Sequence, residues 1–121
     1  MRILILDDQP GLAEMMALSL RAGGFAATGF TRPSEALAAL GELDVLVTDY
    51  DMPEMTGLEV AKRAYDHGWR GCLLIMSGRA VAMVGAIEHP LLRVILSKPF
   101  STQNLIEALP GTAHGSELPA A

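Results

Sequence analysis

Acidic side chains end two of the apolar runs in this sequence. Asp7 and Asp8 follow ILIL, and Asp49 follows LVT in the stretch LVTDYDMPEMTG, with Asp51 two places later. A carboxylate at the end of a buried strand loses hydration, which costs free energy unless a partner neutralises the charge. Because carboxylates brought close together also repel one another, the pattern predicts a cation between them.

Two further apolar runs end in groups that bind phosphate. Ser77 follows LLIM, and Lys98 follows VILS. A serine hydroxyl can donate a hydrogen bond to a phosphoryl oxygen, and a lysine ammonium acts as a mobile point charge beside it. Oxygen ligands from a few protein groups suit Mg²⁺, which shares phosphate oxygens with them. We therefore expect a Mg²⁺-dependent phosphoryl site with Asp49 as the nucleophile.

The elements that must position these residues follow from the hydrophobic pattern. Continuous apolar runs at 3–6, 45–47, 73–76 and 94–96 are typical of strands buried on both faces of a parallel sheet, and a weaker run at 25–30 of an edge strand. Helical spacing predicts helices at 13–20, from Pro33, at 58–65 and after the capping residue Ser101. Residues 79–89 contain Gly85 and precede Pro90, so the fourth helix is expected to be short or irregular.

This alternation predicts an α/β fold, with a doubly wound five-stranded parallel sheet and helices on both faces. Ligands of such sheets bind beyond the carboxyl ends of the strands, so the polar residues that end the strands are expected at one edge. We expect residues 1–109 to form this domain and residues 110–121 to be a flexible C-terminal tail or linker stump.

Composition limits the possible functions. The chain has 121 residues, of which 50% are hydrophobic, and a net charge of −5. A negative chain is a poor match to a nucleic-acid backbone, and no apolar run reaches the length of a membrane span, so we expect a cytoplasmic protein without direct nucleic-acid or membrane binding. The single cysteine, Cys72, excludes an internal disulfide, and methionines such as Met15, Met16, Met76 and Met83 are expected in the core.

The motifs together resemble the receiver domain of bacterial two-component response regulators, which has a flavodoxin-like fold. They are Asp7-Asp8 after ILIL, Asp49 in VTDYDMPEMTG, Ser77 in LLIMSG and Lys98-Pro99-Phe100, in the family's order. The resemblance covers residues 1–109. It implies a stand-alone phosphoacceptor signalling module rather than a turnover enzyme, in which Asp49 accepts a phosphoryl group from a sensor histidine kinase or a histidine phosphotransfer protein. The output protein would be a further, unidentified partner.

The resemblance also implies a role for the other acids. Asp8, Asp49 and the backbone carbonyl of Asp51 would bind Mg²⁺ directly, and Asp7 would act mainly through water. Lys98 would contact the phosphoryl group.

A cis peptide bond between Lys98 and Pro99 is a further implication of the resemblance. The family commonly has an aromatic residue three positions before this lysine, which moves inward when the strand hydroxyl turns toward the phosphoryl group. Here that position is Ile95, which has neither a ring nor a hydroxyl. We therefore expect an atypical output, with an ordering of residues 79–90 on phosphorylation.

A second pair of residues is expected at the mouth of the pocket. Asp51 follows Asp49 by two places, and Arg79 follows Ser77 by two places. On neighbouring strands these two side chains would face each other and partly screen an acyl phosphate from water.

Other functions stay open at this stage. Asp49-Tyr50-Asp51 also mimics the signature of Mg²⁺-dependent phosphohydrolases of the haloacid-dehalogenase kind, although that motif normally ends the first strand. A receiver-like module that only docks, without phosphorylation, is another alternative. The chain could also be part of a larger regulator or hybrid kinase.

Overall fold

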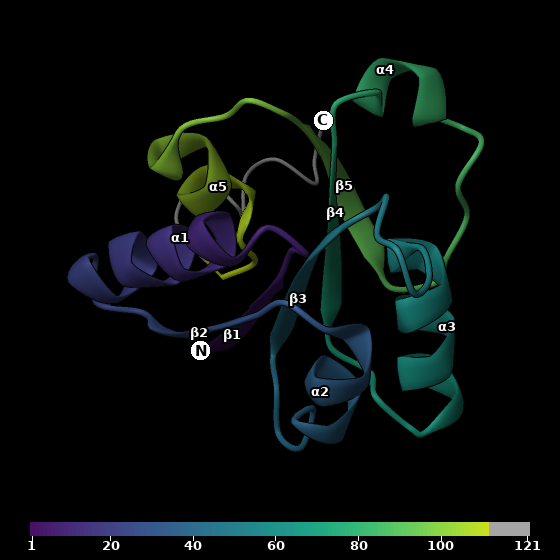
Figure 1. Cartoon of the computed structure of the whole chain (residues 1–121), viewed down its shortest axis with the longest axis horizontal. Helices are drawn as coiled ribbons and strands as arrows, with labels where there is room; N and C mark the ends of the chain where they lie inside the picture. Colours follow the sequence, from purple (N-terminus) through teal and green to yellow (C-terminus); the bar gives the residue numbers. More distant parts are fainter. Residues whose placement is uncertain (112–121) are drawn as a thin grey trace.

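Strands and helices alternate along the chain in this computed structural model, which describes residues 1–111 (Figure 1). The strands are β1 (Arg2–Leu6), β2 (Ala26–Phe30), β3 (Val45–Asp49), β4 (Cys72–Ser77) and β5 (Leu92–Ser97). The helices are α1 (Pro10–Ala22), α2 (Pro33–Ala38), α3 (Gly57–Asp66), α4 (Ala80–Met83) and α5 (Thr102–Ala108). Most of the predicted tail, residues 112–121, lies outside the described residues, so that prediction is untested.

The five strands form one parallel sheet in the order β2-β1-β3-β4-β5. This confirms the predicted sheet and the edge position of β2. The chain passes from β1 to β2 on one side of β1 and then crosses to β3 on the other side. The switch in strand order therefore lies between β1 and β3. In open α/β sheets the ligand crevice lies at this point, next to the ends of the strands that carry Asp7 and Asp49.

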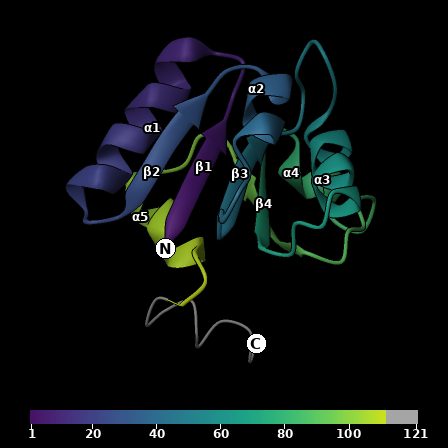
Figure 2. The ribbon, with the colours of Figure 1, turned by 90° about the horizontal axis from the view of Figure 1, so that it is seen from below.

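Helices cover both faces of the sheet (Figure 2). One apolar core joins α1 and α5 to one face, with Ala17, Leu20 and Leu105 among its fully buried members. The other core joins α2, α3 and α4 to the opposite face, with Val60 and Ala61 fully buried. Burial on both faces explains why the central strands are continuously apolar in sequence.

The fourth helix is short, as predicted. It spans only Ala80–Met83, and no regular element occupies residues 84–91. Gly85, at φ +83, adopts a left-handed backbone conformation that ends the helical turn. The apolar residues Val81 and Val84 are 86% and 73% exposed, so this segment buries little apolar surface.

One prediction about the core was wrong. Met15 is 61% exposed on α1, whereas Met76 and Met83 are buried. Met15 occupies the outer face of α1, because the inward positions of this helix are those of Ala13, Ala17 and Leu20. In the described part of the chain, no helix is long and apolar enough to cross a bilayer.

Candidate functional site

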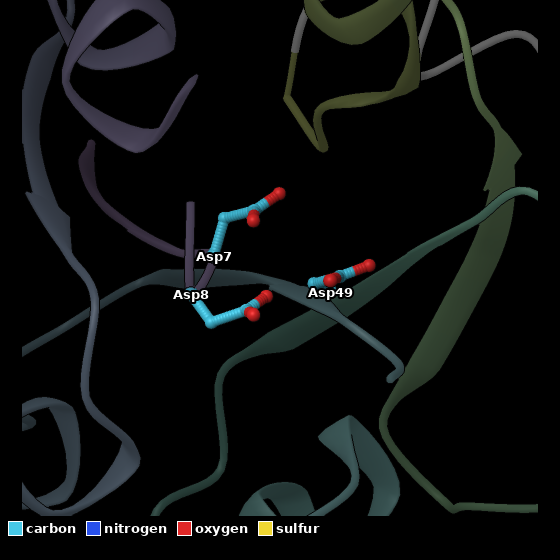
Figure 3. Close-up of side chains that lie close together, drawn as sticks. All are labelled: Asp7, Asp8 and Asp49. Atoms are coloured by element: carbon cyan, nitrogen blue, oxygen red, sulfur yellow. The ribbon is translucent and has the colours of Figure 1, made fainter. Parts of the chain in front are cut away.

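Three carboxylates meet at the carboxyl ends of β1 and β3. One oxygen from each of Asp7, Asp8 and Asp49 lies within 4.8 Å of the other two (Figure 3). Asp7 and Asp8 directly follow β1, and Asp49 is the last residue of β3, the strand beside it. The parallel pairing of β1 with β3 therefore produces the cluster that the sequence predicts.

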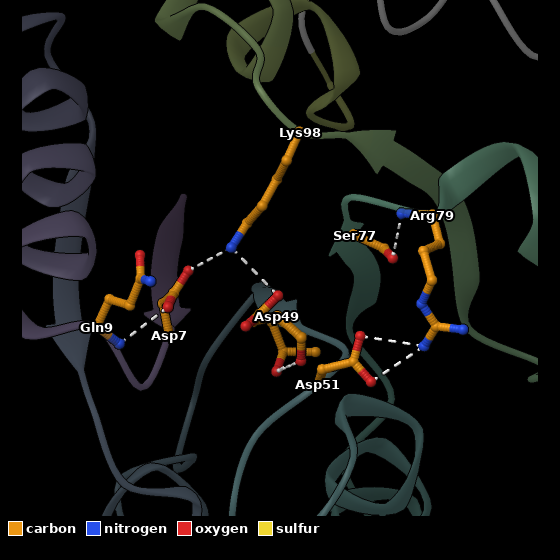
Figure 4. A network of polar contacts seen from close by, with 8 residues as sticks. Asp7, Gln9, Asp49, Asp51, Ser77, Arg79 and Lys98 are labelled. Atoms are coloured by element: carbon orange, nitrogen blue, oxygen red, sulfur yellow. Dashed lines mark hydrogen bonds and ion pairs between the residues drawn. The ribbon is translucent and has the colours of Figure 1, made fainter.

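Lys98 lies between two of these acids. Its Nζ is 2.8 Å from Asp7 Oδ2 and 3.2 Å from Asp49 Oδ1 (Figure 4). Asp7 is completely buried, and its other oxygen, Oδ1, accepts a hydrogen bond of 3.0 Å from the backbone N–H of Gln9. Lys98 reaches this position from the end of β5, because its N–H donates to the Ser77 carbonyl and extends the β4–β5 pairing.

The pocket shifts the titration of both Asp49 and Lys98. Burial, followed by the negative charge of Asp7, raises the pKa of Asp49 above its usual value, although Lys98 opposes the shift. Burial alone would lower the pKa of Lys98, but the hydrogen bond to Asp7 and the charges of Asp7 and Asp49 outweigh it and raise the pKa. One ammonium therefore compensates the acidic cluster only in part.

The backbone around Asp49 is held by close packing. Gly57, the first residue of α3, donates its N–H to the Tyr50 carbonyl at 2.8 Å. A Cβ on Gly57 would lie 2.4 Å from the carbonyl oxygen of Asp49, so only glycine allows this approach without displacement. The Thr48 hydroxyl donates to the same Asp49 carbonyl at 3.0 Å.

Ser77 is buried at the end of β4, beside the acidic pocket. Its Oγ accepts a hydrogen bond of 2.9 Å from the backbone N–H of Arg79 (Figure 4). Because the hydroxyl acts here as an acceptor, its own proton stays available for donation to an incoming oxygen.

The predicted contact between Arg79 and Asp51 is present. Arg79 Nη2 lies 3.1 Å from both carboxylate oxygens of Asp51, and both side chains are more than half exposed. The pair joins the loop after β3 to the loop after β4, at the rim of the pocket that contains Asp49 (Figure 4).

The remaining predicted positions lie on or after β5. The Lys98–Pro99 peptide bond is cis, in agreement with the implication of the resemblance. Ile95 is half-buried and packs against the core on the α3 side of the sheet. An aliphatic side chain therefore occupies the place where the family commonly has an aromatic residue.

The chemistry of the cluster fits a hard divalent cation. Its donors are carboxylate oxygens, and Asp8 is only partly buried, which leaves room for water in the coordination shell. The raised pKa of Asp49 shows that its charged form lacks full compensation, which a cation would supply.

Two details of the site were not predicted: the cap of the helix beside Asp49 and the contact of Gly57 with the Asp49 carbonyl. The helix beside Asp49 begins with a capping box in which Thr56 Oγ1 accepts from the Glu59 N–H and Glu59 accepts from the Thr56 N–H. The spacing T-x-x-E is a signal in the sequence that could have revealed this cap. The contact of Gly57 with the Asp49 carbonyl has no such local signal.

Comparisons with known proteins agree with this geometry. The family model for the response regulator receiver domain matches residues 3–110. The response regulator receiver protein CpdR of Brucella abortus is 31% identical over 111 residues, which cover 89% of this chain and 92% of CpdR. The DNA-binding response regulator MtrA of Mycolicibacterium smegmatis is 35% identical, and the match covers 87% of this chain but only 47% of MtrA. This chain thus spans about half the length of the MtrA relative.

A solved structure shows the same fold. The response regulator TrrA of Thermotoga maritima, in complex with Mg²⁺ and BeF, has a TM-score of 0.76 and 24% identity; the match covers 88% of this chain and 93% of that one.

Proposed function

The chain belongs to the response regulator receiver domain family, and from this premise we propose that it signals by accepting a phosphoryl group on Asp49. The observation that carries the proposal is the convergence of three carboxylates with one ammonium. Lys98 Nζ lies 3.2 Å from Asp49 Oδ1, inside a cluster whose acids come from two neighbouring strands. A carboxylate beside groups that can neutralise phosphate charge supports a role of Asp49 as the nucleophile.

The transfer uses a phosphohistidine as donor. A carboxylate oxygen of Asp49 attacks the phosphorus, the P–N bond to the imidazole breaks, and its electron pair stays on the imidazole nitrogen. Lys98 neutralises charge on the transferred group, and the Ser77 hydroxyl donates a hydrogen bond to one of its oxygens. The signal ends when water attacks the phosphorus, which restores the Asp49 carboxylate and releases inorganic phosphate.

We propose Mg²⁺ as the cation of the acidic cluster. Asp8, Asp49 and the backbone carbonyl of Asp51 would hold it directly, and Asp7 would act through water. When bound, it supplies charge neutralisation and orientation for the phosphoryl oxygens. TrrA, which shares the fold, was crystallised with Mg²⁺ and BeF.

We propose a sensor histidine kinase or a histidine phosphotransfer protein as the donor partner. The structural relatives include the receiver domain of the hybrid histidine kinase CckA, at 25% identity and a TM-score of 0.75. A cytoplasmic location belongs to the same proposal.

A mass measurement tests the chemistry. The protein is incubated with Mg²⁺ and acetyl phosphate, and intact mass is recorded for wild type, Asp49→Asn and the neighbouring control Asp51→Asn. We expect one phosphoryl adduct on wild type and on Asp51→Asn, and none on Asp49→Asn. An adduct that persists on Asp49→Asn would contradict the assignment.

The same preparation separates signalling from hydrolysis. A receiver labels itself and turns over slowly, whereas a phosphohydrolase of the haloacid-dehalogenase kind would cleave p-nitrophenyl phosphate repeatedly. Sustained turnover of this ester, abolished by Asp49→Asn, would favour the hydrolase. The absence of any adduct on wild type would favour a module that only docks.

A further inference from the structure

His89 is one of the few anchors of the segment that joins α4 to β5. Residues 84–91 form neither helix nor strand, and Val84, Gly85, Ala86 and Glu88 are exposed. Ile87 is buried in the core on the α3 side, and the half-buried ring of His89 follows two places later. The position of this segment therefore depends on a small number of side chains.

One ring nitrogen of His89 has a defined partner. Nδ1 accepts a hydrogen bond of 3.1 Å from the backbone N–H of Leu91, inside the same segment. Because Nδ1 is the acceptor, the neutral ring carries its proton on Nε2.

Aromatic packing connects the ring of His89 to α3. The rings of His89 and Tyr65 meet edge to face, with centroids 5.6 Å apart and planes at 90°. The guanidinium of Arg70 lies over the Tyr65 ring, 3.6 Å from its centroid. His89 thus holds its own segment through the hydrogen bond from Leu91 and contacts α3 through its ring.

We propose that neutral His89 is a proton-sensitive clasp that holds the segment between α4 and β5 against α3. A proton added to Nδ1 would face the Leu91 N–H, so that two donors would oppose each other where one bond existed. The hydrogen bond between His89 and Leu91 would then break, and residues 84–91 would lose an anchor. This device is independent of phosphoryl transfer, because it uses none of the residues of the acidic pocket.

The cations near the ring favour the closed, neutral form. Lys62 lies on α3, and Arg70 lies beyond Tyr65, just before β4. Glu88 precedes His89 in its own segment and is exposed. Burial, with a smaller effect from Lys62, lowers the pKa of His89 below its usual 6.5, although the backbone of Ala61 opposes the shift.

The sign of the linkage follows from this lowered pKa. The folded state prefers the neutral ring, so the clasp contributes its full stability above the unfolded-state pKa of 6.5. That contribution is lost as the pH falls from there through the folded-state pKa. Mild acidity therefore loosens this segment before it unfolds the domain.

Amide hydrogen exchange tests the clasp in unphosphorylated protein without added Mg²⁺, so its outcome does not depend on phosphorylation. Protection factors, corrected for intrinsic exchange, are compared at about pH 7.5 and about pH 5.5. In wild type we expect the protection of the Leu91 amide to fall by about threefold to tenfold at the lower pH. NMR of the neutral His89 side chain should show the Nε2–H tautomer.

Two substitutions separate the clasp from a general effect of acid. His89→Asn keeps an acceptor two residues before the Leu91 N–H but cannot titrate, so its protection should be the same at both pH values. In His89→Ala, the Leu91 amide should show low protection at both pH values. His67→Asn, which removes an exposed histidine at the end of α3, should behave as wild type. Equal pH dependence of Leu91 in wild type and His89→Asn would overturn the proposal, as would an Nδ1–H tautomer.

Discussion

Charge balance is the main feature of the pocket at the scale of single residues. Three carboxylates face one ammonium, and the most buried acid, Asp7, has the shortest contact with Lys98 at 2.8 Å. Asp49 receives the second contact of the same ammonium, at 3.2 Å. Its charged form is therefore the less stabilised of the two, which suits a nucleophile that needs a cation before it reacts.

The first prediction concerns the cost of this charge. Because the pKa of Asp49 is raised in the folded state, its ionised form lowers the free energy of unfolding. This loss of stability is complete above the folded-state pKa. It disappears as the pH falls through the folded-state pKa toward the unfolded-state value of 3.8. In the absence of divalent cations at neutral pH, Asp49→Asn should raise Tm by about 4 °C, or roughly 1 kcal/mol. Thermal unfolding followed by circular dichroism measures the change.

Its control is Glu42→Gln, which removes an exposed acid outside the pocket and should leave Tm unchanged. The difference in Tm between Asp49→Asn and wild type should become smaller toward pH 4 or on addition of Mg²⁺. A lower Tm for Asp49→Asn at neutral pH would show that the pairing with Lys98 outweighs the burial and the repulsion.

A second prediction concerns the exposed pair between Arg79 and Asp51. Such pairs contribute roughly 0–1 kcal/mol, so the effect on stability should be small. We expect the pair to screen an acyl phosphate on Asp49 from water, so Arg79→Ala should speed autodephosphorylation by about twofold to fivefold. Loss of radiolabelled phosphate from the isolated phosphoprotein gives the rate. Arg79→Lys keeps the charge, so its autodephosphorylation rate should lie between those of wild type and Arg79→Ala. An unchanged half-life for Arg79→Ala would refute the screening role of the pair.

Helix caps and close backbone contacts hold the elements around the site in place. Both α3 and α5 begin with a capping box, from Thr56 and Ser101 respectively. The start of α3 also touches β3, because Gly57 lies against the Asp49 carbonyl. Helix α3 therefore fixes the direction of the strand end that carries Asp49.

The third prediction tests this contact. Gly57→Ala should push the start of α3 away from Asp49 and destabilise the domain by about 1–3 kcal/mol, because the added Cβ meets backbone atoms. Gly11→Ala is a matched control in α1, where a Cβ meets nothing within 4 Å, and it should stabilise by up to about 1 kcal/mol. Urea unfolding of both variants measures the difference. Equal changes in the free energy of unfolding for Gly57→Ala and Gly11→Ala would rule out the steric role of Gly57.

At the scale of the whole molecule, the pocket is connected to α4 through a short path. Ser77 Oγ is bonded to the N–H of Arg79, and Arg79 is the residue that precedes α4. A Ser77 hydroxyl that turns toward a phosphoryl group would release this N–H. Since Ile95 offers no aromatic ring to follow it, the response should concentrate in the loop and short helix beyond Arg79.

The fourth prediction is that phosphorylation orders residues 79–90. Amide hydrogen exchange with Mg²⁺ and beryllofluoride, an analogue of the phosphoryl group, should show increased protection in this segment of wild type. Asp49→Asn under the same conditions should show no change. Unchanged protection in wild type, once binding of the analogue is established, would count against this form of output.

The sequence by itself determined the fold class, the edge of the sheet that carries the site, and the identity of its principal residues. Short continuous apolar runs that alternate with helical patterns are typical of strands covered on both faces, and parallel pairing brings the carboxyl ends of these strands to one edge of the sheet. Asp7, Asp8, Asp49, Ser77 and Lys98 each end such a run, so their convergence could be predicted without knowledge of side-chain positions.

Only the tertiary structure decided how these groups are connected. Local pattern does not relate the parts of the chain that meet in three contacts: the bridge of Lys98 between Asp7 and Asp49, the approach of Gly57 to the Asp49 carbonyl, and the ring contact of His89 with α3. Local pattern also did not show that Met15 points outward. Each depends on the packing distance between elements and on the rotamer that this packing allows. Local sequence determines which face of an element is apolar, but neighbouring elements determine which atoms meet there.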